Sequence, residues 1–425
     1  MTPHTHERLA AHGGPPVRTT PLLPGYPGGL LIGEEEKAAV MEVLDSQSLF
    51  RHYGPRPLHK VARFERAFAD ALGARYAVGV TSGTAALMTA LAALGVGPGD
   101  EVIVPTYTWV ATINAVVALG AVPVFVDIDD TLTMDPTKVE AAVTPCAKVL
   151  LPVHMRGCGA DMAPLLDAAE RRGLRVVEDA AQAVGGRYRG QRLGTLGTLG
   201  AFSLQYHKVI TTGEGGMVVT NDPALWERAV RYHDQGSARM EELDDTLPEG
   251  SPLMIGINFR MSEITGAIGL VQLQRMDWII DRMRAHKRAI VDGLSGLRGL
   301  TIRRVPDPAG DTGATLIFFC PSAESARPFS AALTAEGVRC RIAWDSGQHV
   351  YHHFDQIIER RMFAQRRCAW ECPHYTGHAR LEKGMFPQSD DLLRRAIHID
   401  LHPLFTERDE MDIVRAIRKV AAALL

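Results

Sequence analysis

The sequence predicts an α/β protein in which a mainly parallel sheet, covered by helices on both faces, is followed by a smaller α+β part. Three observations predict this fold class. Between residues 75 and 178, short apolar runs alternate with stretches of helical period, which is the pattern of βαβ units. At 425 residues the chain exceeds the needs of one small core, so two domains are expected. A long helical period at 262–294 precedes a fresh α+β pattern.

The first part of the chain begins with a Pro- and Gly-rich stretch, residues 1–30, which predicts an extended arm rather than a helix. Helical periods follow at 34–44 and 58–72. Strands then alternate with helices. The expected strands are 75–80, 101–104, 122–126, 149–153 and 174–178, and the expected helices are 85–94, 110–119, one that closes at 139–143, and 163–172.

The rhythm changes after residue 200. Apolar runs at 201–204 and 216–220 predict two strands with no helix between them. The long helix at 262–294 carries apolar residues at helical spacing. Beyond Gly299 we expect strands near Ile302, at 316–319 and near Ile342, and helices at 324–335 and 407–424. These patterns predict an arm over 1–30, a large domain over 31–280 and a small C-terminal domain over 281–425.

Charge and composition exclude several classes of partner. The 46 basic and 49 acidic side chains nearly balance, which argues against a nucleic-acid or polybasic membrane surface. No apolar run approaches a membrane span, and the N-terminus lacks the basic start and apolar stretch of a secretory signal. The cysteines are scattered without a second ligand pair at zinc-finger spacing, so we expect reduced thiols, no metal and a cytoplasmic location. They are Cys146, Cys158, Cys320, Cys340, Cys368 and Cys372.

The strongest chemical signal is an acid at a strand end followed by a lysine that enters a glycine-rich turn. Asp179 closes the expected strand 174–178, and Lys208 precedes the glycines of residues 213–216. A pyridoxal cofactor requires an amine that bonds to its aldehyde and a carboxylate that keeps its pyridine nitrogen protonated. Alone, Asp179 also fits a helix N-cap, and Lys208 a solvated lysine. Together they predict a pyridoxal 5′-phosphate site at the ligand edge of the sheet.

A phosphate site is expected beside this pair. Residues 81–87 follow the first strand and open an Ala-rich helix. Ser82, Gly83 and Thr84 are small, so backbone N–H groups and hydroxyls at the helix N-terminus can reach a dianion. A simple helix cap explains the same motif. Trp109 begins the helix after the second strand and can stack on a pyridine ring, although an aromatic in that place is more often a core or surface residue.

These segments together resemble the DegT/StrS family of aminotransferases, which are fold type I pyridoxal-phosphate enzymes of sugar and cyclitol biosynthesis. The likeness extends over nearly the whole chain, and the run at 202–216 is highly specific. The matching segments are 13–18, 81–87, 97–102, 124–127, His154 with Gly157 and Asp161, 178–183, 202–216 and 258–263.

The resemblance implies a role for each matching residue. Lys208 would form the Schiff base and carry the proton, and Asp179 would pair with the pyridine nitrogen. Gln182 would contact the phenolic oxygen of the ring, and Trp109 would stack on it. The phosphate would be held by Ser82, Gly83, Thr84 and Ser203. Asn258 is expected to reach the phosphate of the neighbouring subunit's cofactor, which implies a homodimer with a shared active site.

Three features resemble the glutamine-dependent cyclitol branch, the scyllo-inosose and 2-deoxy-scyllo-inosose aminotransferases. They are Gln205, the Trp-Val-Ala sequence at 109–111 and the opening Gly-Gly-Pro-Pro-Val-Arg at 13–18. The resemblance therefore implies L-glutamine or L-glutamate as amino donor and a keto-cyclitol or keto-sugar as acceptor, in aminoglycoside-like secondary metabolism. Aminohydroxybenzoate synthases share the glutamine, and a nucleotide-sugar aminotransferase is the other alternative, because local likeness does not fix a substrate.

Other functional classes remain to be weighed. Sugar dehydratases of this fold carry His where Lys208 stands, and the adjacent His207, whose role is open, keeps that class in view. A non-catalytic regulator would not need the Asp179 and Lys208 pair. A nicotinamide-binding domain is disfavoured because residues 95–99 precede a strand and do not open a helix. The segment 340–344 departs from the commonest family form, so substrate contacts there are not predicted.

Overall fold

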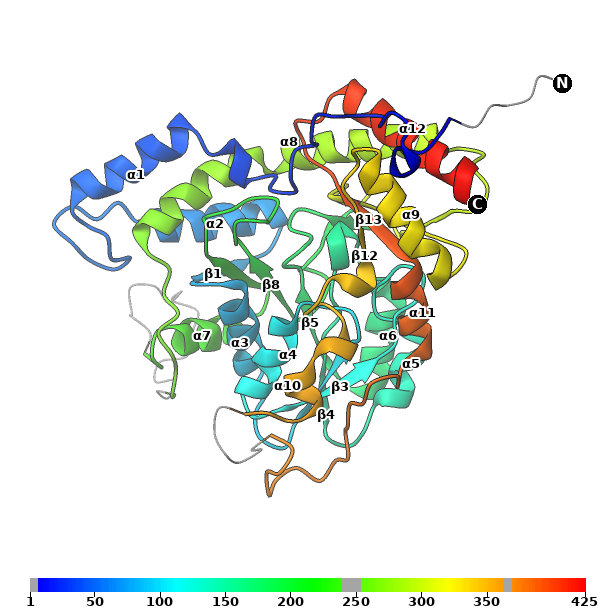
Figure 1. Ribbon diagram of the computed structural model, residues 1–425. Coiled ribbons are helices and arrows are strands. Elements are labelled where there is room, and N and C mark those ends of the chain that lie inside the picture. The colour runs from blue at the N-terminus through cyan, green and yellow to red at the C-terminus, as the bar shows by residue number, and fades with distance from the viewer. Residues whose placement is uncertain (1–6, 238–253, 363–368) are drawn as a thin grey trace.

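A seven-stranded sheet lies at the centre of the computed structural model, which describes residues 7–237, 254–362 and 369–425 (Figure 1). The strand order is β1-β9-β8-β5-β4-β2-β3. Every strand is parallel to the others except β9, which is antiparallel to both neighbours. The strands are β1 (Tyr76–Val80), β2 (Glu101–Pro105), β3 (Val122–Val126), β4 (Ala147–Leu150), β5 (Arg175–Asp179), β8 (Leu199–Ser203) and β9 (Gly216–Thr220).

Helices cover both faces of this sheet, which confirms the predicted fold class. Side chains alternate between faces along each strand: Val102 and Val104 pack in one buried cluster, and Ile103 packs in another. One face carries α3, α4 and α7, and the other carries α2, α5, α6 and α8. Their bounds are α1 (Glu34–Ser46), α2 (Lys60–Leu72), α3 (Gly83–Ala93), α4 (Val110–Ala118), α5 (Pro136–Ala142), α6 (Met162–Arg172), α7 (Pro223–His233) and α8 (Glu263–Gly293).

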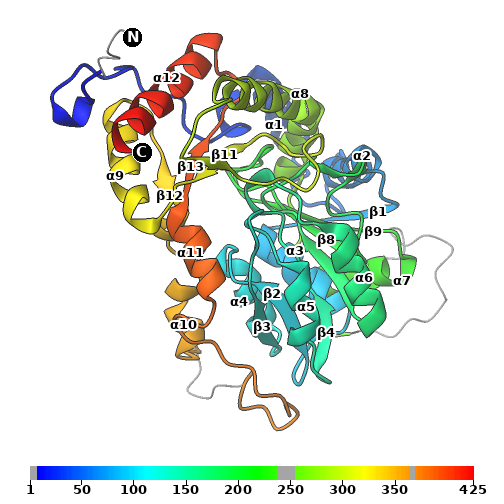
Figure 2. The same cartoon turned by 90° about the vertical axis from the view of Figure 1, so that its right-hand side faces the viewer.

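A second sheet of four antiparallel strands follows, in the order β10-β11-β13-β12. Figure 2 shows α9 and α12 on the side of this sheet that faces away from the large one. The long helix α8 links the two regions, packing on α1 and α2 at one end and on α12 at the other. The elements are β10 (Thr301–Ile302), β11 (Thr315–Phe319), α9 (Ala323–Ala335), β12 (Arg341–Ile342), α10 (Asp355–Ile358), α11 (Pro387–Arg395), β13 (Ala396–Asp400) and α12 (Glu407–Leu424).

The N-terminal arm is irregular apart from two short 3-10 turns, Ala10–His12 and Gly29–Leu31. It is tied to the second sheet's helices, because the backbone N–H groups of Ala10 and Val17 donate to Glu336. The predicted domain division at residue 280 falls inside α8 and stays a prediction.

Several elements differ from the sequence prediction. The strand expected at 149–153 spans Ala147–Leu150, and of residues 151–153 only Val153 forms a β-bridge, to Asp179. The helix expected from residue 58 begins at Lys60, since His59 adopts a left-handed conformation with φ 52°. The elements that were not predicted include α7, α10, α11, β13 and the small hairpin of β6 (Arg187–Tyr188) and β7 (Gln191–Arg192).

The described residues were expected to hold no membrane-spanning helix, no metal site and no disulfide, and the following statements concern those residues alone. No helix there is long and apolar enough to cross a membrane. Within the same ranges no three His, Cys, Asp or Glu side chains are grouped as metal ligands. The cysteines in these ranges are free thiols, and Cys368 lies outside them.

Candidate active site

A cavity of about 720 Å³ opens where the carboxyl ends of the parallel strands face the second sheet. Its walls come from three parts of the chain: the arm at residues 22–27, the large sheet with its loops, and the second sheet with its neighbouring segments. The structure brings eight of the predicted site residues to this cavity, namely Ser82, Gly83, Thr84, Trp109, Asp179, Gln182, Ser203 and Lys208. Their roles stay predictions, but their placement in one cavity is what the proposed chemistry needs.

Asp179 is the last residue of β5 and is 4% exposed. Its Oδ2 accepts a hydrogen bond of 2.7 Å from Thr112 Oγ1, and its Oδ1 accepts one of 3.1 Å from the backbone N–H of Ala181. Burial raises the pKa of Asp179 above its ordinary value, while the Thr112 and Ala181 hydrogen bonds and the charge of Lys208 oppose the rise. Thr112 Oγ1 also lies 2.7 Å from Thr108 Oγ1. A short hydroxyl chain therefore orients this carboxylate.

Lys208 lies in the turn after β8, where its backbone N–H donates to the carbonyl of Gln205. Burial lowers the pKa of Lys208 below its ordinary value; Asp179 opposes the shift, and the nearby charge of Arg156 adds to it. A lowered pKa increases the fraction of neutral amine, which is the nucleophilic form. The glycine turn that follows is tight, because a Cβ on Gly216 would lie 2.3 Å from the carbonyl oxygen of Ser82.

The N-terminus of α3 forms a cradle beside Lys208. Ser82 caps this helix by accepting a hydrogen bond from the backbone N–H of Ala85 at 3.1 Å. Gly83 fits closely against Ser203, since a Cβ on Gly83 would lie 2.7 Å from the Cβ of Ser203. Free backbone N–H groups at a helix start favour a bound anion. The acid, the amine and this anion site are the donor set that pyridoxal 5′-phosphate requires, so the residues fit the predicted cofactor.

Trp109 caps α4 and is 46% exposed. Its ring contacts the His349 ring, with centroids 4.8 Å apart and planes tilted by 52°. An indole that lines a cavity with so much of its surface open has room for a stacked ring. Burial lowers the pKa of His349 to about 4, so this imidazole is neutral at physiological pH.

A buried hydrogen-bond network fixes the strand that carries Asp179. Glu178 and His154 are fully buried, with Glu178 Oε2 2.8 Å from His154 Nε2. His154 Nδ1 accepts from the backbone N–H of Ala160, so the proton of the neutral imidazole lies on Nε2. The Glu178 carboxylate accepts further hydrogen bonds from the backbone N–H groups of Gly194, Leu196 and Gly197. This network holds the end of β5 in place.

Several cavity residues were missed by the sequence reasoning because they lie in segments without a recognisable motif. The arm contributes Tyr26, whose ring packs 4.5 Å from that of His207. His207 therefore packs on the arm and also lines the cavity. Other missed polar residues of the cavity include Thr112, Arg156, Arg339, Cys340, Arg341, His349, His398 and Asp400. Cys340 and Arg341 belong to the segment for which no substrate contact was predicted.

Asn258 does not line this cavity. It is exposed, pairs with Asp234 through a β-bridge, and its Oδ1 accepts from the backbone N–H of Arg260 at 3.3 Å. Its expected contact with a neighbouring subunit's cofactor stays a prediction.

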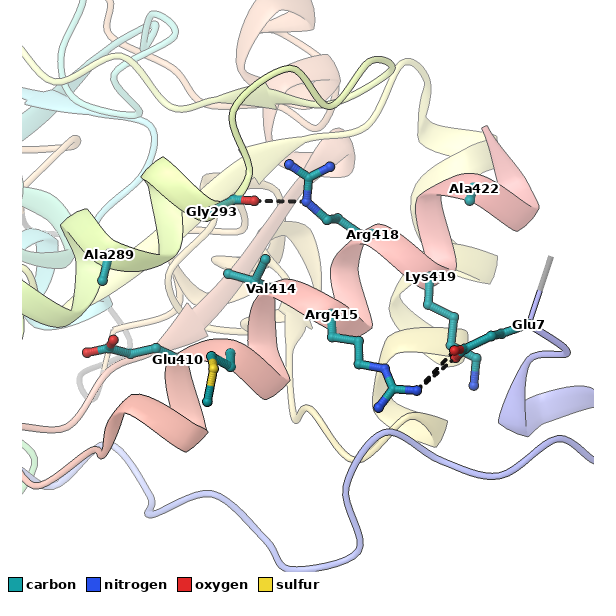
Figure 3. A pocket seen from close by; sticks show the side chains of 10 residues that line it. Glu7, Ala289, Gly293, Glu410, Val414, Arg415, Arg418, Lys419 and Ala422 are labelled. Carbon is teal, nitrogen blue, oxygen red and sulfur yellow. Dashed lines mark hydrogen bonds and ion pairs between the residues drawn. The ribbon is translucent and has the colours of Figure 1, made fainter. Parts of the chain in front are cut away.

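A second hollow of about 680 Å³ lies between α8 and α12 and contains none of the predicted site residues (Figure 3). Its charged side chains already have partners. Arg415 pairs with Glu7 at 3.0 Å, and Arg418 Nε donates to the carbonyl of Gly293 at 2.8 Å. Lys419 Nζ lies 2.8 Å from Glu336 Oε2. Because these polar groups are paired, this hollow is not a candidate for the chemistry.

Comparison with known proteins supports one family. The family model described as the DegT/DnrJ/EryC1/StrS aminotransferase family matches residues 31–366. An L-glutamine:2-deoxy-scyllo-inosose aminotransferase of Micromonospora echinospora is 36% identical over 97% of this chain and 98% of its own length. A GDP-perosamine synthase of Caulobacter vibrioides is 45% identical, but over 54% of this chain and only 60% of that protein.

Among solved structures, 3-amino-5-hydroxybenzoic acid synthase matches with a TM-score of 0.77 and 28% identity. The match covers 95% of this chain and all of that one. Sequence and structure thus point to the same group of enzymes.

Proposed function

The chain belongs to the DegT/DnrJ/EryC1/StrS aminotransferase family and is a pyridoxal-phosphate-dependent aminotransferase, and from this premise we propose that it transfers an amino group from L-glutamine or L-glutamate to a keto-cyclitol or keto-sugar. One observation carries the proposal: Lys208, Asp179 and the cradle at Ser82 line a single cavity. When bound, the cofactor supplies an electron-accepting ring that stabilises negative charge on the reacting carbon.

We assign the chain's own residues to the steps that surround this chemistry. Asp179, held by Thr112 and the N–H of Ala181, holds the proton on the pyridine nitrogen. Lys208 would hold the cofactor covalently at rest, and its amine would carry the proton that leaves the donor carbon. Its lowered pKa supports both tasks, because each requires a neutral amine for part of the cycle.

The remaining predicted residues position the cofactor. The phosphate is assigned to Ser82, Gly83, Thr84 and Ser203 at the start of α3. Both Gln182 and Trp109 line the cavity. Gln182 would contact the phenolic oxygen of the cofactor ring, and the half-exposed indole of Trp109 would stack on that ring. Asn258 serves a second subunit in a homodimer. A cytoplasmic location stays a prediction.

The substrate assignment depends on the relatives that match the whole chain. The 2-deoxy-scyllo-inosose aminotransferase of Micromonospora echinospora aligns over 97% of this chain, so both the cofactor site and the second sheet are included. The alternative, a nucleotide-linked keto-sugar, is favoured by the higher identity to GDP-perosamine synthase over a shorter region. An aminohydroxybenzoate-synthase-like reaction is the other alternative, from the structural match.

The covalent assignment is tested by reducing the coloured enzyme with borohydride and mapping the labelled peptide by mass spectrometry. We expect the cofactor's mass on Lys208, and no labelled peptide from Lys208→Ala. Lys138→Ala is the matched control, because this exposed lysine lies outside the cavity. Label on another lysine of the wild type would refute the assignment.

The substrate class is tested with a panel of amino donors and ketone acceptors, with amine products identified by mass spectrometry. We expect L-glutamine or L-glutamate to aminate a scyllo-inosose-type ketone. Turnover of a nucleotide-linked keto-sugar, without turnover of any free cyclitol ketone, would establish the alternative instead.

A further inference from the structure

Arg156 presents to the cavity a guanidinium group that is only partly paired, with the Tyr107 side chain and Asp400 as its neighbours. Its side chain is 17% exposed and lines the cavity. Within the described residues, its Nε has no hydrogen-bond partner. Its nearest ion pair is with Asp400, whose Oδ1 lies 3.9 Å from Nη1, which is too long for a hydrogen bond. A shielded guanidinium of this kind costs free energy unless another group pairs with it.

The turn that carries Arg156 is held in place from two sides. Arg156 lies in the 3-10 turn Met155–Gly157 with φ 55° and ψ 43°, a left-handed conformation that is uncommon for a residue with a side chain. Its backbone N–H donates to Gln182 Oε1 at 3.3 Å, and its carbonyl accepts from Arg303 Nη2 at 3.4 Å. The surrounding structure therefore imposes this backbone, which is typical of functional positions.

His398 in β13 supplies a second unpartnered polar atom to the same cavity. It is 2% exposed, and its Nδ1 has no hydrogen-bond partner in the part of the chain that the structure describes. Burial, followed by the charges of Arg156 and Arg341, holds the pKa of His398 well below its ordinary value. This imidazole is therefore neutral, and it offers a hydrogen bond rather than a charge.

The charges that face the cavity leave Arg156 in need of an anion. The cationic side chains are Lys208, Arg156, Arg339 and Arg341, of which Arg339 and Arg341 are exposed at the mouth. The acidic ones are Asp179, Glu214 and Asp400. Asp179 is committed to the ring nitrogen under the proposed function. Asp400, whose side chain is 46% exposed, is the acid within ion-pair distance of Arg156, but at 3.9 Å it forms no hydrogen bond.

We propose that Arg156 binds the α-carboxylate of the amino donor, and that Asp400 is its alternative partner while the uncharged ketone occupies the cavity. This inference rests on the proposed function. Both candidate donors carry an α-carboxylate on the carbon whose amine takes the place of Lys208, so this group must lie close to that lysine. Arg156 lies near enough to Lys208 for its charge to lower the pKa of that lysine. The backbone N–H of Arg156 donates to Gln182, which lies on the side of the cavity assigned to the cofactor.

The chemistry of the group favours a carboxylate. A guanidinium binds a carboxylate through two parallel N–H bonds, and such pairs are both strong and directional. The other two arginines of the cavity, Arg339 and Arg341, are exposed to solvent, whereas the shielded guanidinium of Arg156 suits a single carboxylate. His398 Nδ1 is available to a second oxygen or hydroxyl of the substrate. The same cavity must accept a charged donor and a neutral acceptor in turn, and a weak pair with Asp400 allows that exchange.

The test measures the two half-reactions separately, by single-turnover changes in the cofactor's absorbance. For Arg156→Gln we expect the apparent dissociation constant of L-glutamine to rise about 100-fold, the size of one lost charge-assisted pair. The constant for the neutral ketone should change less than threefold, which also shows that the variant is folded. Arg156→Lys keeps the charge but cannot form two parallel N–H bonds. Its apparent dissociation constant for L-glutamine should therefore be about tenfold lower than that of Arg156→Gln.

A second donor makes the test specific to the α-carboxylate. The wild type should discriminate strongly against L-glutamine α-amide, and Arg156→Gln should lose most of that discrimination. Arg339→Gln is the matched control, because it removes the same charge from the exposed mouth. It should affect both donors equally and weakly.

The outcomes separate the two proposals. If the wild type shows no half-reaction with any amino donor, the proposed function fails. If the wild type reacts with L-glutamine and Arg156→Gln binds it equally well, the assignment of Arg156 is overturned. An equal loss for the donor and the ketone would also overturn it.

Discussion

The hydrogen bond from Thr112 to Asp179 is predicted to set the pH range of activity. Thr112→Val keeps the shape of a side chain that is 1% exposed but removes the hydroxyl 2.7 Å from Asp179 Oδ2. That hydroxyl is one of the groups that oppose the rise in the pKa of Asp179. Its loss should therefore raise this pKa further, so that the carboxylate takes up a proton nearer to neutral pH.

The size of the effect follows from the type of hydrogen bond. A hydrogen bond to a buried charged group contributes about 1.5–3 kcal/mol. One pKa unit corresponds to about 1.4 kcal/mol, so we expect the pKa of Asp179 to rise by about one to two units. Activity requires the ionised carboxylate. It is therefore lost as pH falls through this higher pKa, and the acid limb of the profile should move toward neutral by the same amount.

The assay is the pH dependence of kcat/KM for the donor half-reaction. Thr112→Ser retains the hydroxyl and should leave the acid limb within about half a unit of the wild type. Thr108→Val is the matched control, because it removes the other hydroxyl of the chain, 2.7 Å from Thr112 Oγ1, without touching Asp179. It should shift the limb less than Thr112→Val does.

A Thr112→Val profile with an unshifted acid limb and a uniformly lower rate would refute this reasoning. That result would mean that Thr112 acts through packing rather than through the charge of Asp179. Full recovery of the rate at alkaline pH would support the electrostatic account, since the carboxylate is ionised there in both proteins.

Three further perturbations test the scaffold. Glu178→Gln replaces a buried carboxylate, which accepts from His154 and three backbone N–H groups, with an amide whose –NH2 cannot accept. Denaturant titration should therefore show a loss of about 1–3 kcal/mol or more. A change below about 1 kcal/mol would contradict the role of the network. Gly83→Ala places a Cβ 2.7 Å from the Cβ of Ser203. A cofactor titration should therefore show binding weakened by about tenfold or more. Gly97→Ala is the control and should leave cofactor binding unchanged, because the nearest atom to its new Cβ is 3.9 Å away. Burial lowers the pKa of His233 to about 3. Below about pH 6.5 the unfolded chain therefore binds a proton that the native protein does not, so the free energy of unfolding should fall between pH 6.5 and 3, by several kcal/mol at most. His233→Gln should reduce this dependence on pH.

The parts of the fold that the sequence predicts are those with strong local signals. The strands β2, β3 and β9 are apolar runs bounded by turns, and they lie within a residue of where they were expected. Helix α7 was missed although Asp222 caps it and Pro223 opens it, a start signal that can be read from sequence. Helix α11 ends at Arg395 and strand β13 begins at Ala396. Because no turn residues lie between them, the sequence does not show where the helical pattern of apolar residues gives way to the strand pattern.

The candidate site divides in the same way. Asp179, Lys208 and the cradle at Ser82 belong to motifs whose residues lie close together in sequence, and the parallel sheet brings their strand ends to one edge. Thr112 was not predicted, because its contact with Asp179 spans 67 residues and its sequence context is an ordinary helix.

Arg156 and His398 could not be predicted from sequence patterns. Nothing in their sequence neighbours distinguishes them from other buried polar residues. Arg156 lies in the 3-10 turn Met155–Gly157 and His398 lies in β13, 242 positions later in the sequence. What makes them candidates is a missing partner, since Nε of one and Nδ1 of the other are shielded and without a hydrogen bond among the described residues. A missing partner is a property of three-dimensional packing alone. The proposed cofactor site is thus predictable from local motifs, whereas the groups proposed here to bind the amino donor can be identified only from the three-dimensional packing around the cavity.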